Sequence, residues 1–133
     1  MGRPVLSEQG VPFLRTLGVR VRESGERHAI VEADVREEHG NYRGGAHGGL
    51  VATLVDTVCF FPRPFLPSGM SVATTHLAVS FVRPAAVGDH LVSRCDVVHL
   101  GRRTASLTVR VTRSDGEVVA HGTVGLMLLR EDG

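Results

Sequence analysis

Hydrophobic residues recur along the chain with two periods, one of about two residues and one of about 3.6 residues. Val11, Leu14 and Leu17 follow the helical period near the N-terminus. They predict a short N-terminal helix over 11–17 that Gly18 ends. Alternating apolar and polar positions, separated by turns rich in glycine or proline, predict strands over 19–23, 27–35, 70–83, 89–100, 103–113 and 117–129.

A second apolar stretch, 44–61, opens with a glycine-rich turn and predicts one buried central helix. Large apolar residues cover all sides of its helical projection, as in a helix that protein encloses, and they are Leu50, Val51, Leu54, Val55, Val58, Phe60 and Phe61. Two strands, this helix and four more strands predict an α+β fold, with a curved antiparallel sheet of about six strands wrapped around a long central helix. No repeat or linker interrupts the 133 residues, so we expect a single domain over 1–133.

Composition and charge limit the partners that the chain can have. The net charge is +1 and there is no Trp, so we expect no nucleic acid partner. The N-terminus lacks an apolar signal core and no run approaches the ~18 apolar residues of a membrane span, which predicts no membrane partner and a cytoplasmic protein. The seven histidines lack metal-binding spacing, so we expect no metal or other cofactor. Cys59 and Cys95 are predicted to be reduced core residues, and a nucleophilic Cys59 is the alternative.

The predicted central helix contains one carboxylate, Asp56. Burying an unpaired carboxylate is costly, so such a group is usually paired or functional. Asp56 could reach solvent or answer Arg43 or Arg63. The residues before the helix favour function, because Asn41, His47 and Gly48 bring an amide, an imidazole and a bare backbone N–H to a helix start. The free N–H groups and the positive dipole end of a first turn suit a developing oxyanion.

The spacing of these groups has a geometric consequence. Asp56 lies nine residues beyond His47, which in a helix is roughly 13 Å along the axis and about half a turn around it. One copy of the helix can hardly direct both ends at one small group. Two antiparallel copies can, so we predict a homodimer with two active sites that both subunits share.

The spacing Asn41-x5-His47-Gly48-Gly49-x6-Asp56, followed by the segment 73–84 (Ala-Thr-Thr-His-Leu-Ala-Val-Ser-Phe-Val-Arg-Pro), resembles the hotdog-fold acyl-CoA thioesterases of the phenylacetate-degradation (PaaI-like) type. The resemblance covers the chain from about His39 onward. It implies the hotdog fold and hydrolysis of an acyl- or aryl-acyl-CoA substrate, such as phenylacetyl-CoA or a hydroxylated derivative. It also implies a homotetramer built as a dimer of dimers.

The same resemblance assigns catalytic roles. Gly48 N–H would polarise the thioester carbonyl, while Asn41 and His47 would help to place the thioester and water. Asp56 would be either a general base for water or a nucleophile that forms a mixed anhydride, and both routes stay open. Thr74, eighteen residues beyond Asp56, matches a Ser or Thr of the family that holds water. The structural alternatives are a turn role for Asn41 and an ordinary strand position for Thr74.

Substrate contacts are predicted on two parts of the chain. Gly49 and Thr53 share the helix side of Asp56 and leave room for a substrate. The arginines that could bind the phosphates of coenzyme A, or simply lie on the surface, are Arg83, Arg102 and Arg103. The aromatic residues Phe60, Phe61 and Phe65 could form a wall of the acyl pocket or belong to the core. Pro62 and Pro64 depart from the family pattern and leave the shape of that pocket undetermined.

Two other functions fit the same fold. A hotdog dehydratase or hydratase would act on a β-hydroxyacyl or enoyl thioester, but the His-Phe-Pro type of motif common in acyl-carrier-protein dehydratases is missing. A non-catalytic acyl-CoA-binding protein would use the same pocket without turnover.

Overall fold

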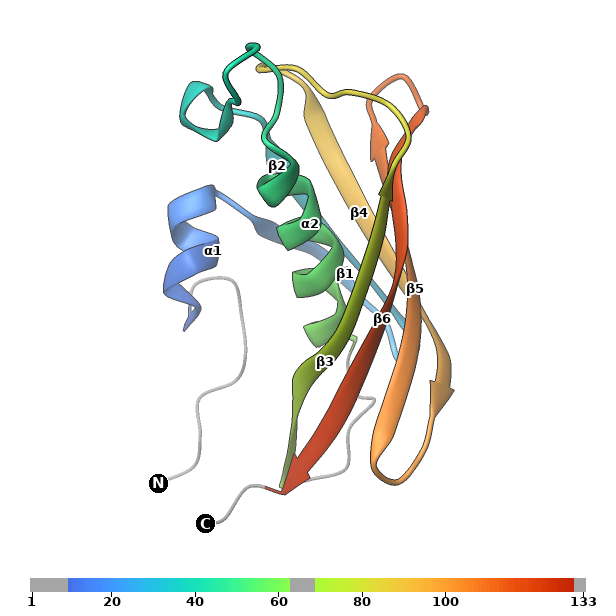
Figure 1. The fold of residues 1–133 in the computed structure, drawn as a ribbon. Coiled ribbons are helices and arrows are strands. Elements are labelled where there is room, and N and C mark those ends of the chain that lie inside the picture. Colours follow the sequence, from blue (N-terminus) through green and yellow to red (C-terminus); the bar gives the residue numbers. More distant parts are fainter. Residues whose placement is uncertain (1–9, 63–68, 131–133) are drawn as a thin grey trace.

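A computed structural model describes residues 10–62 and 69–130. Its six strands form one antiparallel sheet in the order β1-β2-β4-β5-β6-β3, and α2 lies across one face of that sheet (Figure 1). The elements are α1 (Pro12–Leu17), β1 (Arg20–Ser24), β2 (His28–Asp34), η2 (Glu37–His39), α2 (Gly48–Thr57), η3 (Val58–Phe60), β3 (Met70–Phe81), β4 (His90–Leu100), β5 (Thr104–Arg113) and β6 (Val118–Arg130). The predicted α+β fold is confirmed, and each predicted strand is present with ends shifted by no more than two residues.

The core lies between α2 and the inner face of the sheet. Leu54, Val55 and Val58 are fully buried from the helix side. Alternate residues of the strands meet them, as in β5, where the inward positions Ala105, Leu107, Val109 and Val111 are all buried. Alternation therefore located the strands and their buried faces correctly, because a residue's face in a strand depends on its position alone.

The central helix begins later than the sequence predicts. Gly44 has φ +84°, a left-handed conformation that favours glycine. Ala46 N–H then donates to the carbonyl of Ala85 at 2.8 Å, which keeps this segment extended. The helix starts at Gly48 after the N-cap residue His47, and its last turn tightens into η3. The expectation of a helix from residue 44 was wrong because backbone bonds to a distant loop hold the glycine-rich entry.

One side of α2 is not enclosed by its own chain. Ala52, Thr53 and Asp56 are only half-buried, in contrast to the large apolar residues on the other sides. The prediction that protein surrounds the helix on all sides is therefore wrong for this face within one chain. The apolar pattern could not reveal this, because small residues such as Ala52 and Thr53 suit either environment.

Strand β3 forms one edge of the sheet. On this edge Leu77 is 42% exposed and Phe81 is 56% exposed, so large apolar side chains lie uncovered. The neighbouring strand β6 approaches β3 closely at Gly122, where a Cβ atom would lie 2.2 Å from the carbonyl oxygen of Ala78. A glycine is thus needed for β3 to pair along its length.

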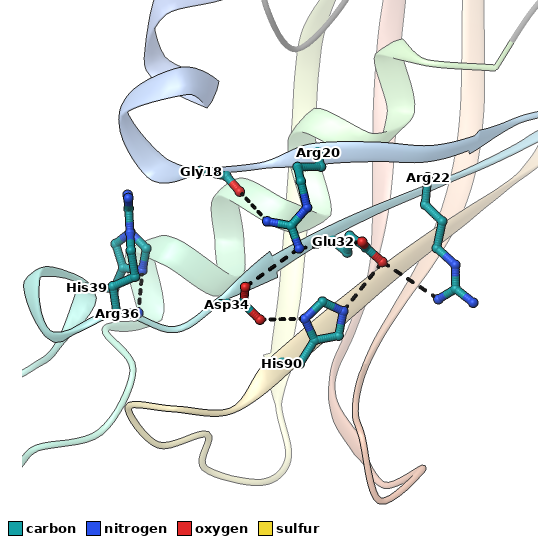
Figure 2. Close-up of polar contacts among 8 residues, drawn as sticks. All are labelled: Gly18, Arg20, Arg22, Glu32, Asp34, Arg36, His39 and His90. Atoms are coloured by element: carbon teal, nitrogen blue, oxygen red, sulfur yellow. Dashed lines mark hydrogen bonds and ion pairs between the residues drawn. The ribbon is translucent and has the colours of Figure 1, made fainter.

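Charged residues link β1, β2 and β4 on one face of the sheet (Figure 2). His90 Nδ1 is 2.7 Å from Asp34 Oδ1, and His90 Nε2 is 3.4 Å from Glu32 Oε2. Arg20 lies within ion-pair distance of both carboxylates, at 3.5 Å from Glu32 and 3.6 Å from Asp34. This network joins the short edge strand β1 to the rest of the sheet.

Cys59 and Cys95 are free and buried, as predicted. None of the described helices is long and apolar enough to cross a membrane. Within 10–62 and 69–130, no group of three or more His, Cys, Asp or Glu side chains could hold a metal ion.

Candidate active site

The start of α2 is organised by His47. Its Nδ1 accepts a hydrogen bond from Gly49 N–H at 2.8 Å and so caps the helix. Because Nδ1 is an acceptor, the ring proton of His47 resides on Nε2, which makes Nε2 a donor. A Cβ atom on Gly49 would lie 2.9 Å from His47 Nδ1, so glycine permits this cap. In this structure the backbone of Gly49 therefore serves the helix cap, and its predicted role in substrate binding stays a prediction.

Gly48 supplies the donor that remains open in the first turn. It is exposed, and among the described residues its N–H has no acceptor. The donor lies in a hollow of about 520 Å³ that Asn41, Phe81 and Arg83 also line. An unpaired N–H at the positive end of a helix dipole is suited to hold a carbonyl oxygen that gains charge.

Asn41 acts as a turn residue in this structure. Its Oδ1 accepts hydrogen bonds from Arg43 N–H at 2.8 Å and Gly45 N–H at 3.0 Å, which shapes the loop before α2. Its Nδ2 donates to the carbonyl of Ala46 over 3.4 Å, a long bond. The structural alternative thus describes the contacts that Asn41 makes, although the side chain also lines the hollow at Gly48.

Asp56 and Thr74 meet across the gap between α2 and β3. Thr74 Oγ1 donates a hydrogen bond of 2.7 Å to Asp56 Oδ1. Asp56 is half-buried and forms no ion pair within the described ranges, so the expected alternative of a partner in Arg43 is not seen. Arg63 lies outside those ranges. A carboxylate held by one hydroxyl keeps a second oxygen for water or substrate.

A largely apolar hollow of about 300 Å³ lies beside Asp56. Phe60 and Phe61 line it, as expected for a pocket wall, and so does Thr53, whose hydroxyl donates to Gly49 O at 2.7 Å. Phe65 lies outside the described residues. The sequence did not indicate that α1 also lines this hollow, through Val11, Phe13 and Leu14. No local signal could have shown it, because the contact joins residues some 40 positions apart in the sequence.

The three predicted arginines do not gather at one place in the chain. Arg83 lines the hollow at Gly48, pairs with Glu117 at 3.2 Å and donates to Val118 O at 3.0 Å. Arg102 and Arg103 are exposed in the turn between β4 and β5. That turn lies at the end of the sheet opposite the start of α2 (Figure 1). One chain therefore cannot bring all three side chains to one phosphate group.

Cys59 is not placed to act as a nucleophile. The thiol of Cys95 beside it raises the pKa of the Cys59 thiol, and burial raises it further. Its Sγ points to the carbonyl of Val55 at 3.6 Å and is fully buried. A thiol that resists ionisation is a poor nucleophile.

Gly48 and Asp56 line separate hollows of the same chain. The groups expected to hold the carbonyl and to activate water are thus not brought together within one copy. This agrees with the geometric expectation from their spacing along the helix.

Comparison with known proteins identifies the family. The sequence matches the family model of the thioesterase superfamily over residues 43–120. The chain belongs to this superfamily. It is 30% identical over 112 residues to acyl-coenzyme A thioesterase 13 of Homo sapiens, across 83% of this chain and 80% of the human protein. It is 26% identical over 106 residues to acyl-coenzyme A thioesterase PaaI of Escherichia coli K12, across 80% of this chain and 74% of PaaI.

Among solved structures, a Streptococcus mutans UA159 protein bound to acetyl CoA is similar to this thioesterase, with a TM-score of 0.78 and 26% identity over 86% of this chain and 91% of that chain. The resemblance to the PaaI type and the hotdog fold are both confirmed. So is the predicted enzyme class, a thioester hydrolase.

Proposed function

We propose that this thioesterase hydrolyses acyl-CoA and that each active site is shared between two subunits of a homodimer. The observation that carries the proposal is the carboxylate of Asp56, oriented by Thr74 at 2.7 Å beside an apolar hollow. Two relatives whose names specify acyl-CoA as substrate support the choice of thioester. Asp56 and Thr74 are thus proposed to act on the carbonyl end of the acyl group.

The dimer is supported by what a single chain leaves uncovered. Gly48 and Asp56 line different hollows, one side of α2 is half-exposed, and the edge strand β3 presents Leu77 and Phe81 to solvent. A second copy related by a two-fold axis would cover these surfaces. It would also bring the Gly48 end of one α2 towards Asp56 of the other, since the two helices would run antiparallel.

The proposed reaction uses these groups in order. Gly48 N–H and the Nε2–H of His47 would donate to the thioester oxygen as it becomes an oxyanion, and the loss of one such donor costs about 3 kcal/mol of transition-state stabilisation. Water adds to the carbonyl carbon, the C–S bond breaks, and the coenzyme A thiolate leaves. As a general base Asp56 would take the water proton and pass it to the thiolate. As a nucleophile it would form a mixed anhydride that water then cleaves. Thr74 would orient Asp56 in either route.

Coenzyme A is proposed to lie over the hollow at Gly48. Arg83 lines this hollow together with Arg43, and both side chains reach the surface. Arg102 and Arg103 could contribute to the same cofactor half only from the partner subunit, because they lie at the opposite end of the sheet. Guanidinium groups at these positions suit the phosphates of the nucleotide.

The finer assignments remain proposals. An aryl-acyl substrate of the phenylacetyl type would suit the apolar hollow beside Asp56, and the PaaI relative supports that choice by its name alone. Assembly of two dimers into a tetramer, a role in phenylacetate degradation and a cytoplasmic location are further predictions of this proposal.

Hydrolysis of an acyl-CoA panel by the wild type and by Asp56→Asn tests the proposal. We expect wild-type turnover and a loss of about 100- to 10,000-fold in kcat for the variant, the usual contribution of general acid–base catalysis. Circular dichroism would confirm that the variant folds. Equal rates from the folded variant would remove Asp56 from the mechanism, and hydration of crotonyl-CoA exceeding hydrolysis would indicate a hydratase instead.

A further inference from the structure

The short helix α1 stands beside α2 and forms one wall of the hollow at Asp56 (Figure 1). We infer that this hollow receives the acyl group and that Phe13 of α1 sets the size of acyl group that the enzyme accepts. The inference rests on the proposed function, since it concerns the substrate of the same site. It assigns a specificity role to a segment that lies outside the family motif and outside the matched residues 43–120.

The lining of the hollow has a polar part and an apolar part. Asp56 and Thr53 contribute the polar groups, whereas Phe13, Phe60 and Leu77 contribute large apolar surfaces. A thioester whose carbonyl carbon lies next to Asp56 would place its apolar substituent against these three side chains. Burial of that substituent would stabilise the complex by about 25 cal/mol per Å² of apolar surface, which a coenzyme A half alone cannot supply.

The size of the hollow favours a compact acyl group. Its volume of about 300 Å³ is at the lower end of the range of roughly 300–1,000 Å³ for small-molecule sites. A single aromatic ring or a medium-length alkyl chain fits such a space, but a long fatty chain must extend past the wall. Phe13 is 57% exposed, which places its ring at the rim where a longer chain would leave.

The position of α1 does not depend on Phe13. Leu14 anchors the helix in the core and is only 2% exposed. Gly18 ends the helix in a left-handed conformation, with its N–H bonded to Arg15 O. The guanidinium of Arg36 donates to the carbonyl of Thr16 at 2.5 Å. Truncation of Phe13 should therefore change the rim of the pocket and leave the wall in place.

The test compares Phe13→Ala and Phe13→Trp with a matched control, Thr16→Ala. Thr16 is exposed on the same helix and does not line the hollow, and the contact with Arg36 uses its backbone carbonyl, which the substitution keeps. We would measure kcat and KM for butanoyl-, octanoyl-, palmitoyl- and phenylacetyl-CoA. We expect Phe13→Ala to raise the palmitoyl to phenylacetyl ratio of kcat/KM about tenfold, Phe13→Trp to lower it, and Thr16→Ala to leave it unchanged.

Calorimetric binding of the same acyl-CoAs, with each substitution placed in an Asp56→Asn background, separates the pocket from the chemistry. Dissociation constants that keep the same acyl-length profile in both Phe13 variants would overturn the inference, even if the wild type hydrolyses acyl-CoA rapidly. A profile that depends on Phe13 would support it. If such a profile came with no turnover by the wild type, the proposed hydrolysis would fail while the acyl pocket stood.

Discussion

At the scale of single residues, the helix start leaves one backbone donor for the substrate. Gly49 N–H is bound to His47 Nδ1, whereas Gly48 N–H has no acceptor among the residues that the structure describes. This division of roles explains why two adjacent glycines are needed. Gly49 makes room for the imidazole that caps the helix, and Gly48 lets a ligand approach the open donor.

Replacement of Gly48 by proline would remove this donor and little else. Gly48 is the first helical residue, a position that proline tolerates well. The preceding residue, His47, already has the extended conformation that proline requires, with φ −63° and ψ 136°. We expect Gly48→Pro to lower kcat by about 100- to 1,000-fold, as the loss of an oxyanion donor does elsewhere.

The control for this prediction is Gly48→Ala, which keeps the N–H. A Cβ atom there would lie 3.6 Å from the ring of Phe81, an ordinary contact. Steady-state kinetics of the two variants, with thermal melts to check folding, would separate the two effects. If the proline variant retained the activity of the alanine variant, the oxyanion role of Gly48 N–H would be excluded.

Sequence reasoning identified single residues where spacing carries information. The distance of eighteen residues from Asp56 singled out Thr74, and the hydrogen bond between them confirms that the two side chains meet. Spacing could not tell that the side chain of Asn41 is bonded to its own loop, because many conformations satisfy the same spacing. Phe13 could not be found at all, since its neighbours in the hollow come from distant segments.

At the scale of elements, periodicity predicted what depends on local sequence. The strands were located because alternation fixes a buried face within a few residues. The start of α2 was placed too early because the bond from Ala46 to Ala85 decides it. The order of strands in the sheet, which makes β3 an edge, depends on which strands pair and was not predicted.

The network that joins β1, β2 and β4 predicts a pH-dependent contribution to stability (Figure 2). The hydrogen bond from His90 holds the pKa of Asp34 below its ordinary value, and the nearby charges of His90 and Arg20 lower it further. Since the folded protein depresses this pKa, Asp34 contributes stability above the pKa of the unfolded chain. The contribution is lost as pH falls through the lower, folded pKa.

We therefore expect Asp34→Asn to lower the free energy of unfolding at pH 7 by less than about 1 kcal/mol, since exposed ion pairs contribute little. The side chain of Asp34 is 61% exposed, which keeps the effect in this range. Urea unfolding at pH 7 and at progressively lower pH would measure it, with the variant and the wild type converging in acid. A difference that persisted unchanged in strong acid would contradict the assignment to the carboxylate charge.

At the scale of the whole molecule, the uncovered surfaces lie together. The half-exposed side of α2, the apolar edge strand β3 and the hollow at Asp56 share Leu77 or its neighbours. An edge strand with exposed large apolar residues tends to pair with another chain. The proposed dimer would therefore cover an exposed apolar edge and complete two active sites through the same interface.

The shared site predicts that two inactive variants restore each other. In a hybrid of Asp56→Asn and Gly48→Pro subunits, one site would combine the intact Asp56 of the second variant with the intact Gly48 of the first. The other site would carry both defects. Because a two-fold dimer has two equivalent sites, we expect the hybrid to have about half of the wild-type kcat per dimer.

The two variants would be co-expressed with different affinity tags, and the hybrid would be purified by both tags in sequence. Co-expression of Asp56→Asn subunits with both tags provides the control, since neither of its sites has an intact carboxylate. If each site lay within one chain, every site in the hybrid would carry one defect and activity would stay at the level of the single variants. Restored activity therefore requires that the carboxylate and the backbone donor come from different subunits, whatever the acyl group.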